Sequence, residues 1–98
     1  MNRIKLNDQL TFSIEKEEKR LRLIVSESGD ELVCHKTDRN ELTKFIQSAD
    51  SHLFKGRLQL DKKGENVFIY LKGDIAGVID LSEFERLMNH SYQPKQIA

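Results

Sequence analysis

The chain has 98 residues, which is enough for one domain and too few for two. Lys plus Arg and Asp plus Glu number 16 each, and this balance argues against a strongly basic nucleic-acid-binding module. The single cysteine, Cys34, excludes an internal disulfide, and the longest apolar run, Val67–Leu71, is far shorter than the about 20 residues that cross a bilayer. With a charged N-terminal segment that does not resemble a signal peptide, these features predict a cytoplasmic protein that does not insert into a membrane.

The first half of the chain alternates short apolar segments with polar or glycine-bearing links. Apolar residues at every second position of residues 10–14 predict a half-buried strand. A charged link at 16–19 leads to a second predicted strand at 21–25, rich in branched aliphatic residues. Ser28-Gly29-Asp30 is typical of a tight turn, and a third strand is predicted at about 31–36.

A helix is predicted to follow the third strand. Asp38 can accept a hydrogen bond from the first turn, and Glu41 three residues later completes a sequence typical of a helix start. One face of this helix is apolar and consists of Leu42, Phe45, Ile46 and Ala49.

The second half repeats this order. Residues 58–71 align with residues 12–25 without a gap at an offset of 46, and Gly73-Asp74 matches Gly29-Asp30. A third strand is predicted at about 75–80, where Gly77 indicates a bulge or a close backbone contact. A helix capped by Asp80 or Ser82 follows, with an apolar face of Leu81, Phe84, Leu87 and Met88.

The sequence therefore predicts one α+β domain over residues 1–98, made of two tandem β-β-β-α halves related by a pseudo-twofold axis. The halves span residues 10–49 and 55–90, and residues 91–98 form a flexible tail. Both helices are predicted to cover one side of a mainly antiparallel sheet. The strand positions predicted to be buried beneath them are Phe12, Ile14, Leu21, Leu23, Val25, Leu58, Leu60, Val67, Ile69 and Leu71.

The other face of the predicted sheet carries the candidate contact residues. Alternation places two aromatic residues and several cations there, and we predict that the contact residues are Arg22, Arg57, Phe68, Tyr70 and Lys72. Ile24, the repeat mate of Tyr70, lies on the same face. A sheet face with this composition is typical of a surface that meets a partner.

Three interpretations of this face remain open. It can be covered by a second copy of the protein, forming a dimer, or by the chain's own loops. It can be a platform on which single-stranded DNA or RNA bases stack while Arg and Lys bind phosphates. It can also be a groove for a peptide or small ligand.

Residues 10–90, with two tandem meander-then-helix halves and both helices on one side of an open curved sheet, resemble the Pur-repeat and Whirly single-stranded nucleic-acid-binding proteins. Those repeats have four strands, whereas each half here has three clear ones. The resemblance is one of topology and includes no shared motif, so it carries over no residue. It implies binding of single-stranded nucleic acid on the open sheet face.

The sequence contains no catalytic constellation. Cys34 and His35 are neighbours on a predicted strand and point to opposite faces, so they do not form a nucleophile–base pair, and Cys34 is expected to be a small core residue. The three histidines lack the spacing of metal ligands. We predict no enzymatic activity, cofactor or metal. The expected function is a non-catalytic binding module that forms a homo-oligomer, a dimer, and uses the open sheet face as its contact surface; single-stranded DNA or RNA is the candidate ligand of that face. The alternative is a self-associating protein–protein interaction module or regulatory adaptor that uses the same face.

Overall fold

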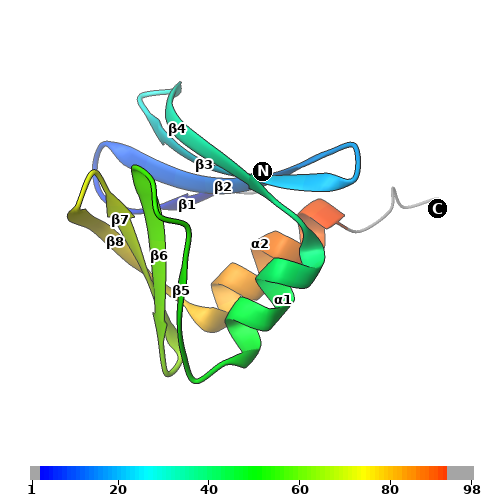
Figure 1. The fold of residues 1–98 in the computed structure, drawn as a ribbon. Coiled ribbons are helices and arrows are strands. Elements are labelled where there is room, and N and C mark those ends of the chain that lie inside the picture. The colour runs from blue at the N-terminus through cyan, green and yellow to red at the C-terminus, as the bar shows by residue number, and fades with distance from the viewer. Residues whose placement is uncertain (1–2, 93–98) are drawn as a thin grey trace.

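The computed structural model describes residues 3–92 and has two four-stranded antiparallel sheets and two helices (Figure 1). The first sheet consists of β1 (Arg3–Lys5), β2 (Leu10–Glu17), β3 (Arg20–Glu27) and β4 (Asp30–Thr37), and α1 (Arg39–Gln47) follows it. The second sheet consists of β5 (Asp50–Leu53), β6 (Leu58–Lys63), β7 (Asn66–Leu71) and β8 (Asp74–Asp80), and α2 (Leu81–Tyr92) follows it. Neighbouring strands in the sequence are neighbours in each sheet. The predicted α+β class and the order of strands followed by a helix, repeated twice, are confirmed.

Each half has one short strand before the three that the sequence predicts. β1 has three residues and β5 has four, and neither carries the apolar alternation of a half-buried strand. They form because each finds an antiparallel partner, β2 for β1 and β6 for β5. The halves therefore begin at Arg3 and Asp50, earlier than predicted.

The strands form two separate sheets rather than one. The sheets are inclined to each other, and both helices lie in the angle between them (Figure 1). The two halves are interleaved, because α2 contacts β2 of the first sheet as well as β7 and β8 of its own. Of the predicted tail, residues 91 and 92 belong to α2, and residues 93–98 lie outside the described part of the chain.

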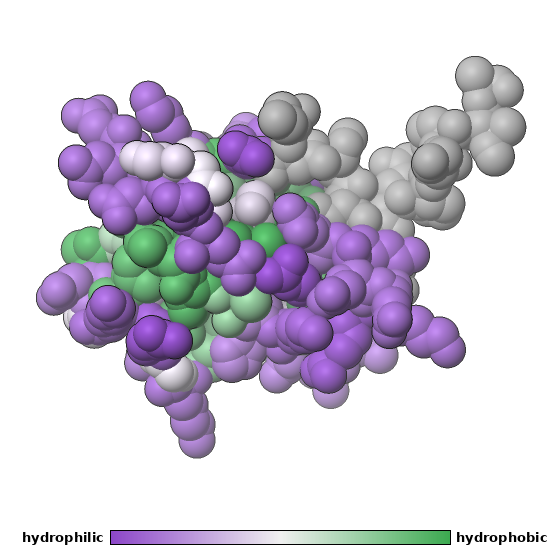
Figure 2. Space-filling view, turned by 90° about the horizontal axis from the view of Figure 1, so that it is seen from above, coloured by the Kyte–Doolittle hydropathy of each residue, from purple (hydrophilic) through white to green (hydrophobic). Residues whose placement is uncertain are grey.

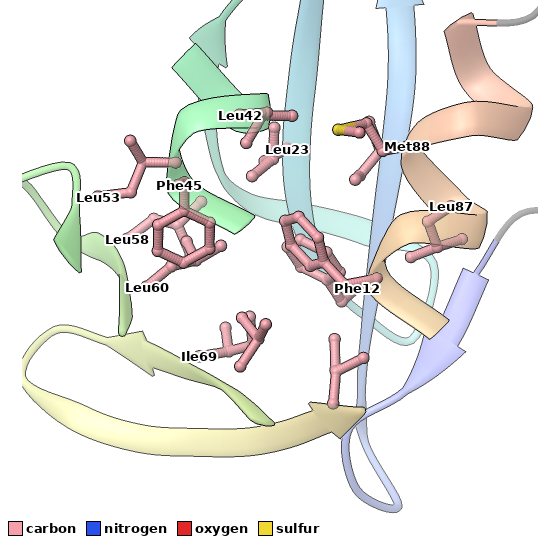
Figure 3. Close-up of a cluster of buried hydrophobic side chains, with 14 of the residues drawn as sticks. Phe12, Leu23, Leu42, Phe45, Leu53, Leu58, Leu60, Ile69, Leu87 and Met88 are labelled. Atoms are coloured by element: carbon pink, nitrogen blue, oxygen red, sulfur yellow. The ribbon is translucent and has the colours of Figure 1, made fainter. Parts of the chain in front are cut away.

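One hydrophobic core fills the space between the sheets and the helices (Figure 3). Nine of the ten strand positions predicted to be buried are at most 1% exposed, and Leu71 is half-buried. Phe12 of β2 stacks on Phe84 of α2 with ring centroids 6.0 Å apart, and Phe45 of α1 lies 5.9 Å from Phe84. Three elements from both halves thus meet in one aromatic cluster.

The helix faces agree with the prediction except at one position. Leu42 and Phe45 of α1 are buried, as are Phe84, Leu87 and Met88 of α2. Ala49 is exposed because α1 ends at Gln47, before that residue.

The local signals that the sequence carries at turns and caps are present in the structure. Ser28 and Gly29 have φ values of 53° and 89°, and Lys72 and Gly73 have φ values of 55° and 88°. Positive φ at both central residues is the geometry that two-residue hairpin loops favour. At the start of α1, the Glu41 backbone N–H donates to Asp38 Oδ1 at 2.8 Å, which is the predicted N-cap.

Candidate binding face on the second sheet

Two of the five predicted contact residues, Phe68 and Tyr70, lie on one face of the second sheet, and two more, Arg57 and Lys72, lie just beyond the strands at one end of it. Phe68 and Tyr70 occupy alternate positions of β7, so both side chains leave the sheet on the side away from the buried Val67 and Ile69. The Lys72 backbone N–H donates to the Arg57 carbonyl oxygen at 2.7 Å, which extends the pairing of β6 with β7 by one row. Arg57 and Lys72 therefore lie opposite each other, one row beyond Leu58 and Leu71. We call this surface the outer face of the second sheet.

Aliphatic, polar and charged side chains surround the two aromatic rings. Phe68 lies opposite Asp61 of β6 and Val78 of β8, and Tyr70 lies opposite Ile75. Both rings are half-buried, whereas Val78 and Ile75 are 50% and 54% exposed. Lys63 Nζ lies 6.0 Å from the Phe68 ring centroid, a distance that allows a cation–π interaction. The centre of the outer face thus combines the two rings and aliphatic side chains with the Asp61 carboxylate, and cations lie at both ends.

Arg22, the fifth predicted residue, lies on β3 of the first sheet and does not join this face. Its guanidinium lies 2.8 Å from Glu31, 3.4 Å from Glu15 and 3.9 Å from Glu17, and it donates to the Cys34 sulfur at 3.4 Å. Hydrogen bonds with Cys34 and Glu31 raise the pKa of Arg22 above its ordinary value. Carboxylates therefore surround this cation.

Cys34 is not a core residue, contrary to expectation. It pairs with Ile24 on the side of the first sheet away from the helices and is half-buried, whereas His35 pairs with Leu23 and faces the interior. The predicted opposite orientation of Cys34 and His35 is therefore confirmed. Ile24 is only 4% exposed although it lies on this outer side, between Ser13 and Cys34 in the flanking strands.

The cations of the outer face differ from Arg22 in their surroundings. Within the described side chains, Arg57, Lys63 and Lys72 have no carboxylate within ion-pair distance. Their charges are consequently available to an anionic partner. Asp61, the acidic residue opposite Phe68 on this face, bonds His52.

A pocket of about 330 Å³ lies at the end of this face, where hairpins of both sheets meet. Its apolar lining consists of Leu10, Leu32, Val33, Leu71, Ile75 and Ala76. Arg57, Lys72, Asp74 and Asn7 supply its polar groups. Figure 2 shows a hydrophobic patch surrounded by hydrophilic residues on the left of the view, on the side where these hairpins lie in Figure 1.

Comparison with known proteins gives no relative: no family model, curated protein or solved structure matches the chain. Within residues 3–92, no group of three or more His, Cys, Asp or Glu side chains is arranged to hold a metal ion. No helix in the same range combines the length and apolar character needed to cross a membrane.

Proposed function

We propose that the chain is a non-catalytic binding module that holds single-stranded nucleic acid on the outer face of the second sheet. The observation that carries the proposal is the position of Phe68 and Tyr70 on one face beside Arg57 and Lys72, two cations without an acidic partner in the described chain. Bases stack on aromatic rings whatever their sequence, and Arg and Lys neutralise the phosphates beside them.

The spacing of the two rings supports this function. Residues at alternate positions of a strand share a face and lie about 6.7 Å apart, so the side chains can meet successive bases of an extended strand. Lys63 at one end of the row and Arg57 and Lys72 at the other can contact the phosphates on either side. Four strands followed by a helix, twice, is also the order expected for the Pur-repeat and Whirly proteins, and the resemblance of the chain to them stays a prediction from topology.

The charge pattern sets the expected strength of binding. The chain has no net charge, so attraction depends on the three unpaired cations of the outer face. Each phosphate contact to a single strand contributes about −0.7 to the slope of log K against log salt, so three contacts give a slope of about −2. We therefore expect weak to moderate binding with a shallow salt dependence.

Fluorescence anisotropy of labelled single-stranded oligonucleotides across a salt series tests this function. Arg57→Gln should make the slope of log K against log salt less negative by about 0.7, because one phosphate contact is lost. Arg22→Gln is the matched control: it removes the same charge from the other sheet and should leave the slope unchanged. Equal effects of the two variants would contradict the assignment of the face.

Self-association is a second candidate function, favoured by a separate observation. Val78 and Ile75 are about half exposed and lie on β8, an edge strand of the second sheet. Aliphatic side chains cannot stack with bases as rings do, and an edge strand offers backbone groups for pairing with another chain. Sedimentation of the wild type and of Val78→Lys tests it, because a homodimer formed through β8 should dissociate when this charge is introduced.

A further inference from the structure

We propose that the pocket between the hairpin ends binds a small aliphatic monocarboxylate. The site lies beside the outer face of the second sheet and shares Arg57 and Lys72 with it. Binding of such a ligand does not depend on whether the face binds nucleic acid.

The size and lining of the pocket fit a small apolar ligand. Its volume of about 330 Å³ is at the lower end of the roughly 300–1,000 Å³ that small-molecule sites occupy. The floor consists of Leu10, Val33, Leu71 and Ala76, which pack against the hydrophobic core. Leu32 and Ile75 form exposed walls at 43% and 54%. Because the lining contains no aromatic ring, it favours an aliphatic chain over a planar ligand.

The polar groups of the pocket select the charge of the ligand. Arg57 and Lys72 contribute two positive charges and Asp74 one negative charge, so the pocket has a net charge of +1. Neither cation forms an ion pair within the described side chains. Asn7 is already engaged, since its Oδ1 accepts from the backbone N–H groups of Gln9 and Leu10. A single carboxylate on the ligand balances the remaining charge.

The fold holds this pocket in place from both halves of the chain. Leu10 and Val33 belong to β2 and β4 of the first sheet, whereas Leu71 and Ala76 belong to β7 and β8 of the second. Since the two halves share one core, the pocket lies at the interface between them and does not depend on the conformation of a single loop. Junctions of this kind are common places for ligand sites.

An NMR titration of the whole chain with butanoate, hexanoate and octanoate tests the proposal. Amide shifts should saturate and should concentrate at Leu10, Val33, Leu71 and Ala76. Affinity should rise about fourfold for each added methylene that becomes buried, until the pocket is full. Hexanoate should bind more tightly than 1-hexanol and hexylamine, because only the carboxylate is attracted by Arg57 and Lys72.

Matched variants separate this site from general apolar adsorption. Lys72→Gln and Leu32→Ser should each weaken hexanoate binding several-fold. Lys63→Gln and Val78→Ser should not, because these residues have similar character and lie outside the pocket. The proposal is overturned if no saturable shift appears at millimolar ligand, or if the alcohol and amine bind as well as the carboxylate. It is equally overturned if sedimentation shows a dimer that Leu32→Ser dissociates, since a second copy would then occupy the pocket.

Discussion

The ring of Phe54 stacks on the imidazole of His35, with ring centroids 3.7 Å apart and planes inclined by 28°. Phe54 follows β5 of the second half, whereas His35 belongs to β4 of the first half. The contact therefore joins the two halves of the chain across their boundary.

A corresponding contact runs in the other direction. Leu6 follows β1 of the first half and lies against Gly77 of β8 in the second half. His35 pairs with Leu23 and Gly77 pairs with Ile69, and these two partners are matched positions of the sequence repeat. Each half thus covers the last strand of the other half with the residue after its own first strand. This exchange, together with the common core, makes the two halves one folding unit.

We predict that Gly77→Ala destabilises the fold by about 1–3 kcal/mol, the usual range for overpacking. A Cβ atom at position 77 would lie 2.9 Å from both Cβ and Cδ2 of Leu6 and 3.3 Å from its Cα, so a shift of the side chain alone cannot remove the clash. Urea unfolding measures the change.

Gly56→Ala is the matched control for this prediction. An added Cβ there meets no atom within 4 Å, and the φ angle of Gly56 is not in the left-handed region. Stability should therefore change by less than about 1 kcal/mol, toward a more stable protein. If both alanine variants have the same free energy of unfolding as the wild type, Leu6 and Gly77 do not form this close contact.

Leu23 and Ile69 are matched core residues. The variants Leu23→Ala and Ile69→Ala should each lower the free energy of unfolding by about 2–5 kcal/mol. Both are completely buried, at corresponding positions of β3 and β7. Val78→Ala, on the exposed side of β8, is the control and should have a small effect. Losses below about 1 kcal/mol at both core positions would mean that the strand faces are reversed.

The pKa of Glu31 provides a pH-dependent prediction. Hydrogen bonds from Cys34 and from Arg22, whose Nη2 lies 2.8 Å from Glu31 Oε1, hold the pKa of this carboxyl below its ordinary value. Because the folded-state pKa is depressed, the stabilisation is present above the unfolded-state pKa and is lost as pH falls through the folded-state pKa. Carboxyl NMR titration should show an upward shift of the Glu31 pKa in Cys34→Ala and in Arg22→Met. Unchanged titration in both variants would rule out these contacts.

Much of the fold could be predicted from the sequence because its signals are local. Apolar alternation identified the strand face that carries Leu23 and Ile69, glycine with its polar neighbours identified the hairpin turns, and Asp38 marked the start of α1. These features depend on neighbouring residues alone, so one sequence is sufficient to find them.

The remaining features depend on contacts between distant segments. β1 and β5 are short and polar, and only their pairing with β2 and β6 makes them strands. Strand alternation assigns Arg22, Phe68 and Tyr70 to the same type of position, facing away from the helices. Arg22 nevertheless belongs to the first sheet and the two aromatic residues to the second, so they do not form one surface. The glutamates around Arg22 come from the two strands that flank β3, and the pocket draws its lining from both sheets. None of these arrangements has a local sequence signal.

The central claim, that the outer face of the second sheet binds single-stranded nucleic acid, is tested most directly by replacing Phe68 and Tyr70 together with alanine. Anisotropy with labelled oligonucleotides should show a loss of about 1–3 kcal/mol for each lost stack, with an unchanged salt slope. Sedimentation of the same samples should show the same oligomeric state for the variant and the wild type. The claim is contradicted if the wild type binds no oligonucleotide below about 100 µM, near the weak limit of ordinary non-specific binding. It is contradicted as well if the double variant binds as tightly as the wild type, or if its main effect is to convert a dimer into a monomer.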